Sequence, residues 1–186
     1  MKTAVTTTGA AALALTLAIT ACGSSPGRAA TPSGVLPAAA VAGLAVVTRP
    51  LTGQDIQKDV NLPHLAARLA GWGYVGGWQR TFQGESRRLT LVVSRSLQFQ
   101  AAPGATAFVA YMHQHVGRFY PFALTSPLKV AGRSGWVIRP PSCACHMATP
   151  LLVGVLANGP KVSWLEINGP RASTQLLARL MARTPA

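Results

Sequence analysis

The chain has 186 residues, 49% of them apolar, which is enough for one domain with a single packed core. It carries 17 Lys and Arg against 4 Asp and Glu, and the formal net charge of +13 attracts polyanions such as nucleic acid, anionic lipid or cell-wall phosphate polymers. After residue 26 no stretch resembles the roughly 20 apolar residues of a spanning helix, which excludes a membrane bundle.

The first residues have the composition of an export signal. Met1 and Lys2 form a short basic start, and residues 10–20 (AAALALTLAIT) are apolar over about the length of a signal-peptide core. A small residue, Ala21, then precedes Cys22. An ordinary signal peptide with a chance cysteine, or a plain N-terminal helix, would also fit these residues.

The segment Ile19-Thr20-Ala21-Cys22 resembles the lipobox of bacterial lipoproteins. The resemblance covers only these 22 residues, with Ile19 where leucine is commonest and a short basic region as departures. It implies a lipoprotein of GC-rich (actinobacterial) type, in which residues 1–21 are a signal peptide and Cys22 carries a diacylglyceryl group. Two acyl chains hold a protein stably on a bilayer. We therefore expect a membrane-anchored protein on the extracytoplasmic face, where nucleic acid is not a partner.

Residues 22–40 are rich in Gly, Ser, Pro and Ala and are expected to form a flexible tether, with a single domain at 41–186. In its first half the domain is expected to form several short elements. They are a strand at 41–47, a polar loop or loose turn of helix at 52–61, a helix at 62–69 capped by Asn61, and hairpin strands at 74–83 and 88–100.

The clearest helix is expected at about residues 103–119. Its apolar positions fall at helical offsets on one face, namely Phe108, Tyr111, Met112, His115, Val116 and Phe119. Short strands follow at 128–131, 136–139, 151–157 and 162–167. Ser173 then caps a final helix with Leu176, Leu177, Leu180 and Met181 facing inward.

This order of elements predicts an α+β fold, an antiparallel sheet with helices packed on it. Hairpin-linked strands with helices between and after them are typical of such a sandwich. The pattern loosely resembles the PsbP/Mog1-type sandwich found in some exported bacterial lipoproteins.

The most unusual stretch is residues 140–147 (PPSCACHM). With Cys22 lipidated, the two remaining cysteines are Cys143 and Cys145. Thiols outside the cytoplasm tend to oxidise, which favours a disulfide between them. The bond would be strained and readily reduced, because the two Cα atoms must come within about 6.8 Å. A thiol-redox role beside His146, or a pair of inert thiols, are the other interpretations.

The same loop could bind a soft metal. Thiolate, imidazole and thioether ligands suit Cu(I), or zinc without the Met, and they would come from Cys143, Cys145, His146 and Met147, with His113 and His115 possible partners. Known zinc signatures use wider cysteine spacing. No cofactor is therefore expected, with copper or zinc as the alternative, and the position of His115 on an apolar face favours a hydrogen-bonded core histidine.

Aromatic residues in 71–78 (GWGYVGGW) could form a sugar-stacking platform, but aromatic side chains of this kind usually fill the core. No G-x-S-x-G, H-E-x-x-H or phosphate-loop motif is present, so no catalytic residue is assigned. Glu166 shares a strand face with Val162 and Trp164, which predicts a partly buried carboxylate paired with an arginine.

Arg87, Arg88 and Arg95 cluster around the predicted hairpin and are the expected basic patch. Taken together, the sequence favours a membrane-anchored, non-catalytic binding module for a partner protein, anionic lipid or cell-wall polymer. The alternative is a copper-handling or thiol-redox lipoprotein that uses the Cys143–His146 loop.

Overall fold

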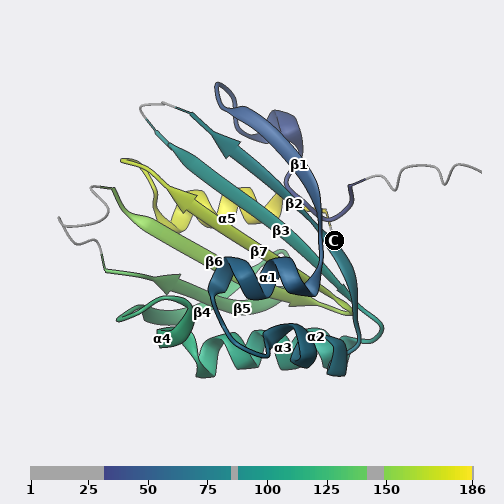
Figure 1. Ribbon diagram of the computed structural model, residues 1–186. Helices are drawn as coiled ribbons and strands as arrows, with labels where there is room; N and C mark the ends of the chain where they lie inside the picture. The colour runs from purple at the N-terminus through teal and green to yellow at the C-terminus, as the bar shows by residue number, and fades with distance from the viewer. Residues whose placement is uncertain (1–31, 85–87, 142–148, 186) are drawn as a thin grey trace, which may run out of the picture. The chain divides into compact units, whose positions relative to one another are not determined.

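The structure is a computed structural model that describes residues 32–84, 88–141 and 149–185, all within a unit that runs from Thr31 to Ala186 (Figure 1). The described strands form one antiparallel sheet in the order β1-β2-β3-β7-β6-β5-β4. They are β1 (Ala45–Leu51), β2 (Tyr74–Gln83), β3 (Leu91–Phe99), β4 (Leu124–Val130), β5 (Arg133–Arg139), β6 (Leu151–Asn158) and β7 (Lys161–Asn168).

The connections explain this order. Strands β1, β2 and β3 follow one another as antiparallel neighbours, and the helical segment after β3 carries the chain to the far edge of the sheet (Figure 1). Strands β4 to β7 then return as a meander, so that β7 pairs with β3 at the centre. The predicted α+β fold with an antiparallel sheet is confirmed.

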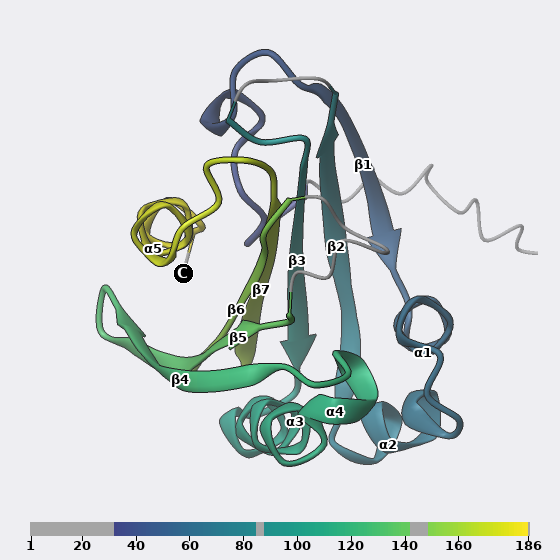
Figure 2. The same ribbon diagram turned by 90° about the vertical axis from the view of Figure 1, so that its left-hand side faces the viewer.

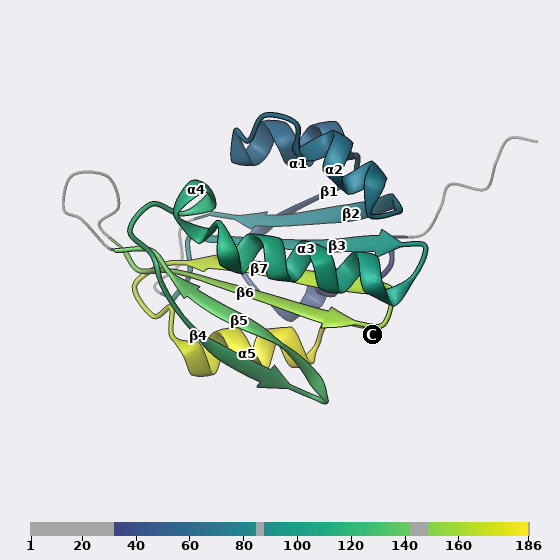
Figure 3. The same cartoon turned by 90° about the horizontal axis from the view of Figure 1, so that it is seen from below.

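Helices cover both faces of the sheet, as the edge-on view in Figure 2 shows. The first face carries α1 to α4, and the view from below shows α3 lying across β3, β7 and β6 (Figure 3). The second face carries α5 and the N-terminal residues 33–41. The helices are η1 (Ala38–Ala40), α1 (Gly53–Val60), α2 (Leu65–Gly71), α3 (Ala102–Gln114), α4 (Val116–Phe119) and α5 (Thr174–Ala182).

Each face has its own apolar core, because successive residues of a strand point to opposite sides. On β7, Trp164 belongs to the core under α3 and Leu165 to the core under α5. Phe108 and Met112 of α3 are buried in the first core, as the predicted apolar helix face requires. Leu177, Leu180 and Met181 of α5 are buried in the second.

Several predicted elements are found where the sequence placed them. The strand at residues 74–83 matches β2, and Ser173 caps α5 by accepting a hydrogen bond from the backbone N–H of Leu176 at 3.2 Å. The helix expected at 103–119 is divided into α3 and α4 at His115, where the backbone leaves helical geometry.

The segment expected to be a loop or a loose turn of helix, residues 52–61, is mostly a regular capped helix, α1. Thr52 and Asp55 make a capping box there: the backbone N–H of Asp55 donates to the Thr52 hydroxyl, and the backbone N–H of Thr52 donates to the Asp55 carboxylate. Asn61 therefore ends α1 in the left-handed conformation instead of beginning the next helix.

The domain also begins earlier than residue 41, so the expected tether of 22–40 is too long. Val35 and Leu36 are buried, and the backbone N–H of Leu36 donates to the Ser94 hydroxyl at 2.9 Å. The backbone carbonyl of Leu36 accepts from Arg80 at 2.8 Å. Residues 33–40 have the composition of a linker, yet two apolar side chains and these bonds hold them to the second face.

Candidate functional site

A row of polar side chains crosses three strands on the first face of the sheet and ends at a tryptophan on a fourth. Arg49 on β1 lies opposite Gln79 on β2, Gln79 opposite Arg95 on β3, and Arg95 opposite Trp164 on β7. Directly opposed residues of antiparallel strands point to the same face. Two arginines are thereby brought beneath α1: Arg95 from the central strand β3 and Arg49 from the edge strand β1.

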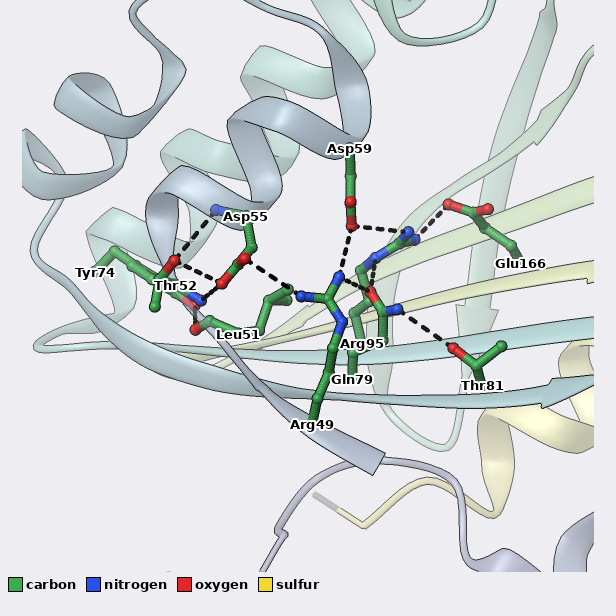
Figure 4. A network of polar contacts seen from close by, with 10 residues as sticks. All are labelled: Arg49, Leu51, Thr52, Asp55, Asp59, Tyr74, Gln79, Thr81, Arg95 and Glu166. Atoms are coloured by element: carbon green, nitrogen blue, oxygen red, sulfur yellow. Dashed lines mark hydrogen bonds and ion pairs between the residues drawn. The ribbon is translucent and has the colours of Figure 1, made fainter. Parts of the chain in front are cut away.

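Arg95 is the centre of this network (Figure 4). Its Nη1 donates to Glu166 Oε1 at 2.5 Å, its Nη2 lies 3.6 Å from Asp59 Oδ2, and its Nε donates to Gln79 Oε1 at 2.9 Å. Burial, the largest single effect, would lower the pKa of Arg95, but the charges of Glu166, Tyr120 and Asp59 and the hydrogen bond to Glu166 together outweigh it, and the pKa is raised. The guanidinium stays charged although Arg95 is only 8% exposed.

Arg49 connects the same network to α1. Its Nη1 lies 3.3 Å from Asp55 Oδ1 and its Nη2 lies 3.2 Å from Asp59 Oδ2. Hydrogen bonds from Thr52, and then the charge of Arg49, hold the pKa of Asp55 below its usual range. The two aspartates stand one helical turn apart on α1, so both reach the arginines.

Two tyrosines border the network. The hydroxyl of Tyr120 donates to Glu166 Oε1 at 2.8 Å, and that of Tyr74 donates to the backbone carbonyl of Leu51 at 2.6 Å. Burial, followed by the charge of Glu166, raises the pKa of Tyr120 well above 10. Burial, followed by the charge of Asp55, raises the pKa of Tyr74. Both phenols are held neutral as hydrogen-bond donors.

This network suits a structural role better than catalysis. All three carboxylates among the described residues, Asp55, Asp59 and Glu166, are paired with Arg49 or Arg95. A carboxylate held by an arginine stays ionised at neutral pH and is a poor general acid. The predicted pairing of Glu166 with an arginine is confirmed, with Arg95 as the partner.

Arg95 therefore does not belong to an exposed basic patch. Its side chain lies on the core face between Val93 and Leu97, and the period of two in that strand was the signal that could have revealed it. Arg88 is exposed, whereas Arg87 lies outside the described residues. Of the expected patch at the hairpin, the structure thus places Arg88 on the surface and Arg95 in the core, and Arg87 stays a prediction.

A different group of arginines gathers around α5 on the second face. Each lies next to α5, on α5 or against the N-terminal segment. We call this group the arginine face; it consists of Arg80, Arg88, Arg133, Arg139, Arg171, Arg179 and Arg183.

Hydrogen bonds to other parts of the chain fix the positions of several of these arginines. Arg133 is buried and donates to the backbone carbonyl of Met181 and, at 2.9 Å, to the Thr184 hydroxyl at the end of α5. Arg139 donates to the Thr174 hydroxyl at 3.2 Å, at the start of α5. A cation at a helix C-terminus stabilises the unpaired carbonyls there, so Arg133 also supports the helix.

The outer part of the arginine face is open to solvent. Arg88, Arg171, Arg179 and Arg183 are all exposed. The described carboxylates all lie on the first face, so none of them neutralises this group. The two faces of the sheet therefore differ in their described charges. The first face holds all the described acidic groups together with cations such as Arg49 and Arg95, whereas the second face holds seven arginines and no described carboxylate.

The predicted metal and thiol residues remain predictions. Cys22, Cys143, Cys145, His146 and Met147 lie outside the described residues. Within the part of the chain that the structure describes, no three His, Cys, Asp or Glu side chains are grouped closely enough to hold a metal ion.

The two histidines of the predicted helix have other contacts. His115 Nδ1 lies 3.0 Å from the backbone carbonyl of Tyr111, so the expected hydrogen bond is present, although the side chain is half-buried and not fully in the core. The ring of His113 stacks on that of Trp136, with 3.5 Å between their centroids.

In the aromatic segment, Trp72 and Tyr74 pack against the first core, as the core interpretation requires. Trp72 lies 5.3 Å from Tyr111 between ring centroids, and Tyr74 lies 5.6 Å from Phe99. These rings are therefore used in packing.

Comparison with known proteins assigns no family. No family model matches the sequence, and no curated protein matches it. Among solved structures, the extracellular domain of PknH from Mycobacterium tuberculosis is similar at 12% identity and a TM-score of 0.37, over 74% of this chain and 80% of that domain. A likeness of this strength carries no conclusion about fold or function. None of the described helices has the length and apolar character needed to span a bilayer.

Proposed function

We propose that the chain is an exported lipoprotein, anchored through Cys22, whose domain is a non-catalytic module that binds anionic lipid of the same membrane through the arginine face. The observation that carries the proposal is the gathering of seven arginines on the second face, where no described carboxylate lies. Each arginine or lysine near an anionic membrane contributes about 1 kcal/mol of attraction. The exposed arginines around α5 are together strong enough to orient a tethered domain.

The path of the chain supports the choice of a membrane over a soluble polyanion. The described chain begins at Pro32, ten residues after Cys22, and a fully extended segment of this length spans at most about 35 Å. The described chain then runs along the second face, where Arg80 and Arg183 bond to the backbone carbonyls of Leu36 and Ala40. The first described residues are therefore held on the same face as the arginines.

Vesicle binding tests the role of the arginine face. The test protein is the mature chain, residues 22–186, carrying Cys22→Ala, because every residue of both cores lies within 36–181. It should co-sediment with phosphatidylglycerol vesicles at low ionic strength and dissociate from them as the salt concentration is raised. It should not bind phosphatidylcholine vesicles. Arg171→Glu with Arg179→Glu should weaken binding at least tenfold.

The matched control reverses two exposed cations on the first face, Lys58→Glu with Arg118→Glu, which changes net charge by the same amount. The affinity of this variant for phosphatidylglycerol vesicles should fall by less than threefold. Equal losses in both variants would show that binding depends only on net charge and would refute an oriented surface. Retention on isolated cell wall but not on vesicles would assign the face to a wall polymer instead.

Anchoring is tested separately in cells. The full chain should fractionate with membranes and carry a diacylglyceryl mass at Cys22. Cys22→Ala should release the exported chain or leave it unprocessed, without that mass. Membrane association of the variant equal to that of the wild type, with no lipid found on either, would contradict the lipoprotein assignment.

A further inference from the structure

A small apolar cavity opens beside α5, next to the arginine face. It is bounded by the N-terminal segment, by the residues just before β3, and by one side of α5 (Figure 2 shows these segments adjacent). Its volume is about 190 Å³, and its lining consists of Ala40, Val41, Ala42, Arg88, Leu89, Leu176 and Leu180.

The walls of this cavity are fixed by hydrogen bonds. Arg183 Nη1 donates to the carbonyl of Ala40 at 3.1 Å, which holds the N-terminal wall against the end of α5. The backbone N–H of Arg171 donates to the carbonyl of Arg88 at 3.0 Å, which holds the residues before β3 against the start of α5. Leu89 and Leu180 are each 5% exposed and belong to the second core. The cavity is therefore preformed.

Size and chemistry restrict what could occupy it. An apolar cavity of about 150 Å³ is large enough to bind benzene, whereas sites for drug-sized molecules are usually about 300–1,000 Å³. The space beside α5 thus suits a short length of one alkyl chain and is too small for a bulky ring system. Six of its seven lining residues are apolar, and the seventh, Arg88, is basic.

The rim is basic. Arg88 lines the cavity, Arg171 is bonded to the backbone of Arg88, and the Arg183 guanidinium lies at the Ala40 wall. A ligand with an alkyl tail in the cavity would place its head among these arginines. Guanidinium groups favour phosphate and carboxylate heads, with which they form paired hydrogen bonds.

We propose that this cavity binds the alkyl chain of an anionic lipid-like amphiphile, whose phosphate or carboxylate head contacts the arginines around α5. The inference rests on the proposed function and deepens it: the arginine face would attract the anionic surface, and the cavity would take up one chain from it. The arginines take part in both contributions, whereas the apolar lining takes part only in the uptake of the chain, so changes to the lining and to the alkyl length test that uptake by itself.

The first experiment titrates hexyl, octyl and decyl phosphate, below their micelle concentrations, into the mature Cys22→Ala chain. Binding should saturate at one ligand per chain. Affinity should rise by about fourfold per methylene until the cavity is full and then level off. Inorganic phosphate alone should not bind at these concentrations. Affinity that does not change with chain length would overturn the proposal.

The second experiment fills the cavity. Ala42 is exposed at the cavity wall, so Ala42→Trp should lower the affinity for decyl phosphate at least tenfold. The control is Thr106→Trp, a similar enlargement at an exposed site on α3. The affinity of this control for decyl phosphate should stay within twofold of that of the wild type. Unchanged affinity in Ala42→Trp would overturn the proposal.

Methyl NMR of the unmodified side chains provides a readout that does not depend on a variant folding. The Leu176 and Leu180 methyl signals should shift on adding decyl phosphate, and those of Leu65 and Leu69 in the other core should not. If the Leu176 and Leu180 methyl signals did not shift, binding of the alkyl chain in this cavity would be contradicted. Failure of the proposed function is distinct: it would appear as vesicle binding that is insensitive to Arg171→Glu with Arg179→Glu, whatever the amphiphile titration shows.

Discussion

The guanidinium carbon of Arg95 lies 4.5 Å from the centre of the Trp164 ring, with the two residues directly opposite one another on the central strands β3 and β7. This contact is one reason that a charged side chain persists in the middle of the sheet. A cation over an aromatic face is worth about 0.5–2 kcal/mol, more when water is excluded. The other reason is that Glu166 and Asp59 supply the counter-charge.

Arg95→Met should destabilise the domain by about 3–5 kcal/mol, because it leaves the partly buried Glu166 carboxylate without its cation. Adding Glu166→Gln should recover part of the loss by removing that unpaired charge. Arg68→Met is the control: Arg68 is exposed and lies over Tyr111 at 5.3 Å, so its loss should cost under about 1 kcal/mol. Urea unfolding at pH 7 measures all three. A cost below about 1 kcal/mol for Arg95→Met would show that the network contributes little.

Stability should fall above about pH 10, because Tyr74 and Tyr120 are held neutral in the fold. A phenol whose pKa is higher folded than unfolded stabilises the fold below its unfolded value, near 10, and that contribution is lost as pH rises toward the folded value. Tyr74→Phe should reduce this alkaline loss and also cost about 1 kcal/mol at pH 7 through the hydrogen bond to Leu51. Unfolding followed from pH 8 to 11 provides the test. An identical alkaline slope in wild type and variant would be evidence against it.

Two helical glycines should respond oppositely to alanine. At Gly104 on α3 an added Cβ would lie 2.0 Å from the backbone carbonyl oxygen of Trp72, so Gly104→Ala should destabilise by about 1–3 kcal/mol. At Gly117 on α4 nothing lies within 4 Å of the added Cβ, and Gly117→Ala should be neutral or stabilise by up to about 1 kcal/mol. Thermal unfolding of both variants gives the comparison. Equal effects would mean that helix propensity, and not the α3 contact with Trp72, decides the outcome.

The capping box of α1 should make part of the stability acid-sensitive. The pKa of Asp55 is lowered in the fold, first by hydrogen bonds from Thr52 and then by Arg49, so its contribution is present above the unfolded value near 4 and is lost as pH falls through the lowered value. Thr52→Ala should cost about 1 kcal/mol at pH 7 and flatten this acid dependence. Ser173→Ala, which removes the cap of α5, is the control, because no carboxylate takes part in that cap. It should lower stability equally at pH 7 and pH 3.

The regular periodicities of the sequence were enough to predict much of the fold. The helix face of Phe108 and Met112, the strand at residues 74–83 and the Ser173 cap each follow from local spacing, and the structure has all three. Helix α1 was expected to be no more than a loop or a loose turn of helix, because it carries one buried apolar residue, Ile56, although Thr52 and Asp55 have the spacing of a capping box. The buried start at Leu36 was missed because its neighbours have the composition of a linker.

The sequence by itself determined the excess of positive charge, the candidate lipid attachment at Cys22 and the alternation that turns Glu166 inward. Only the tertiary structure decided which charges meet. Arg95 looked like surface until the register of β3 placed it beside Gln79 and Trp164 beneath α1. The seven arginines around α5 come from separate segments between residues 80 and 183. They form one face because the sheet and its packed helices, which depend on long-range contacts and not on local spacing, bring those segments to the same side.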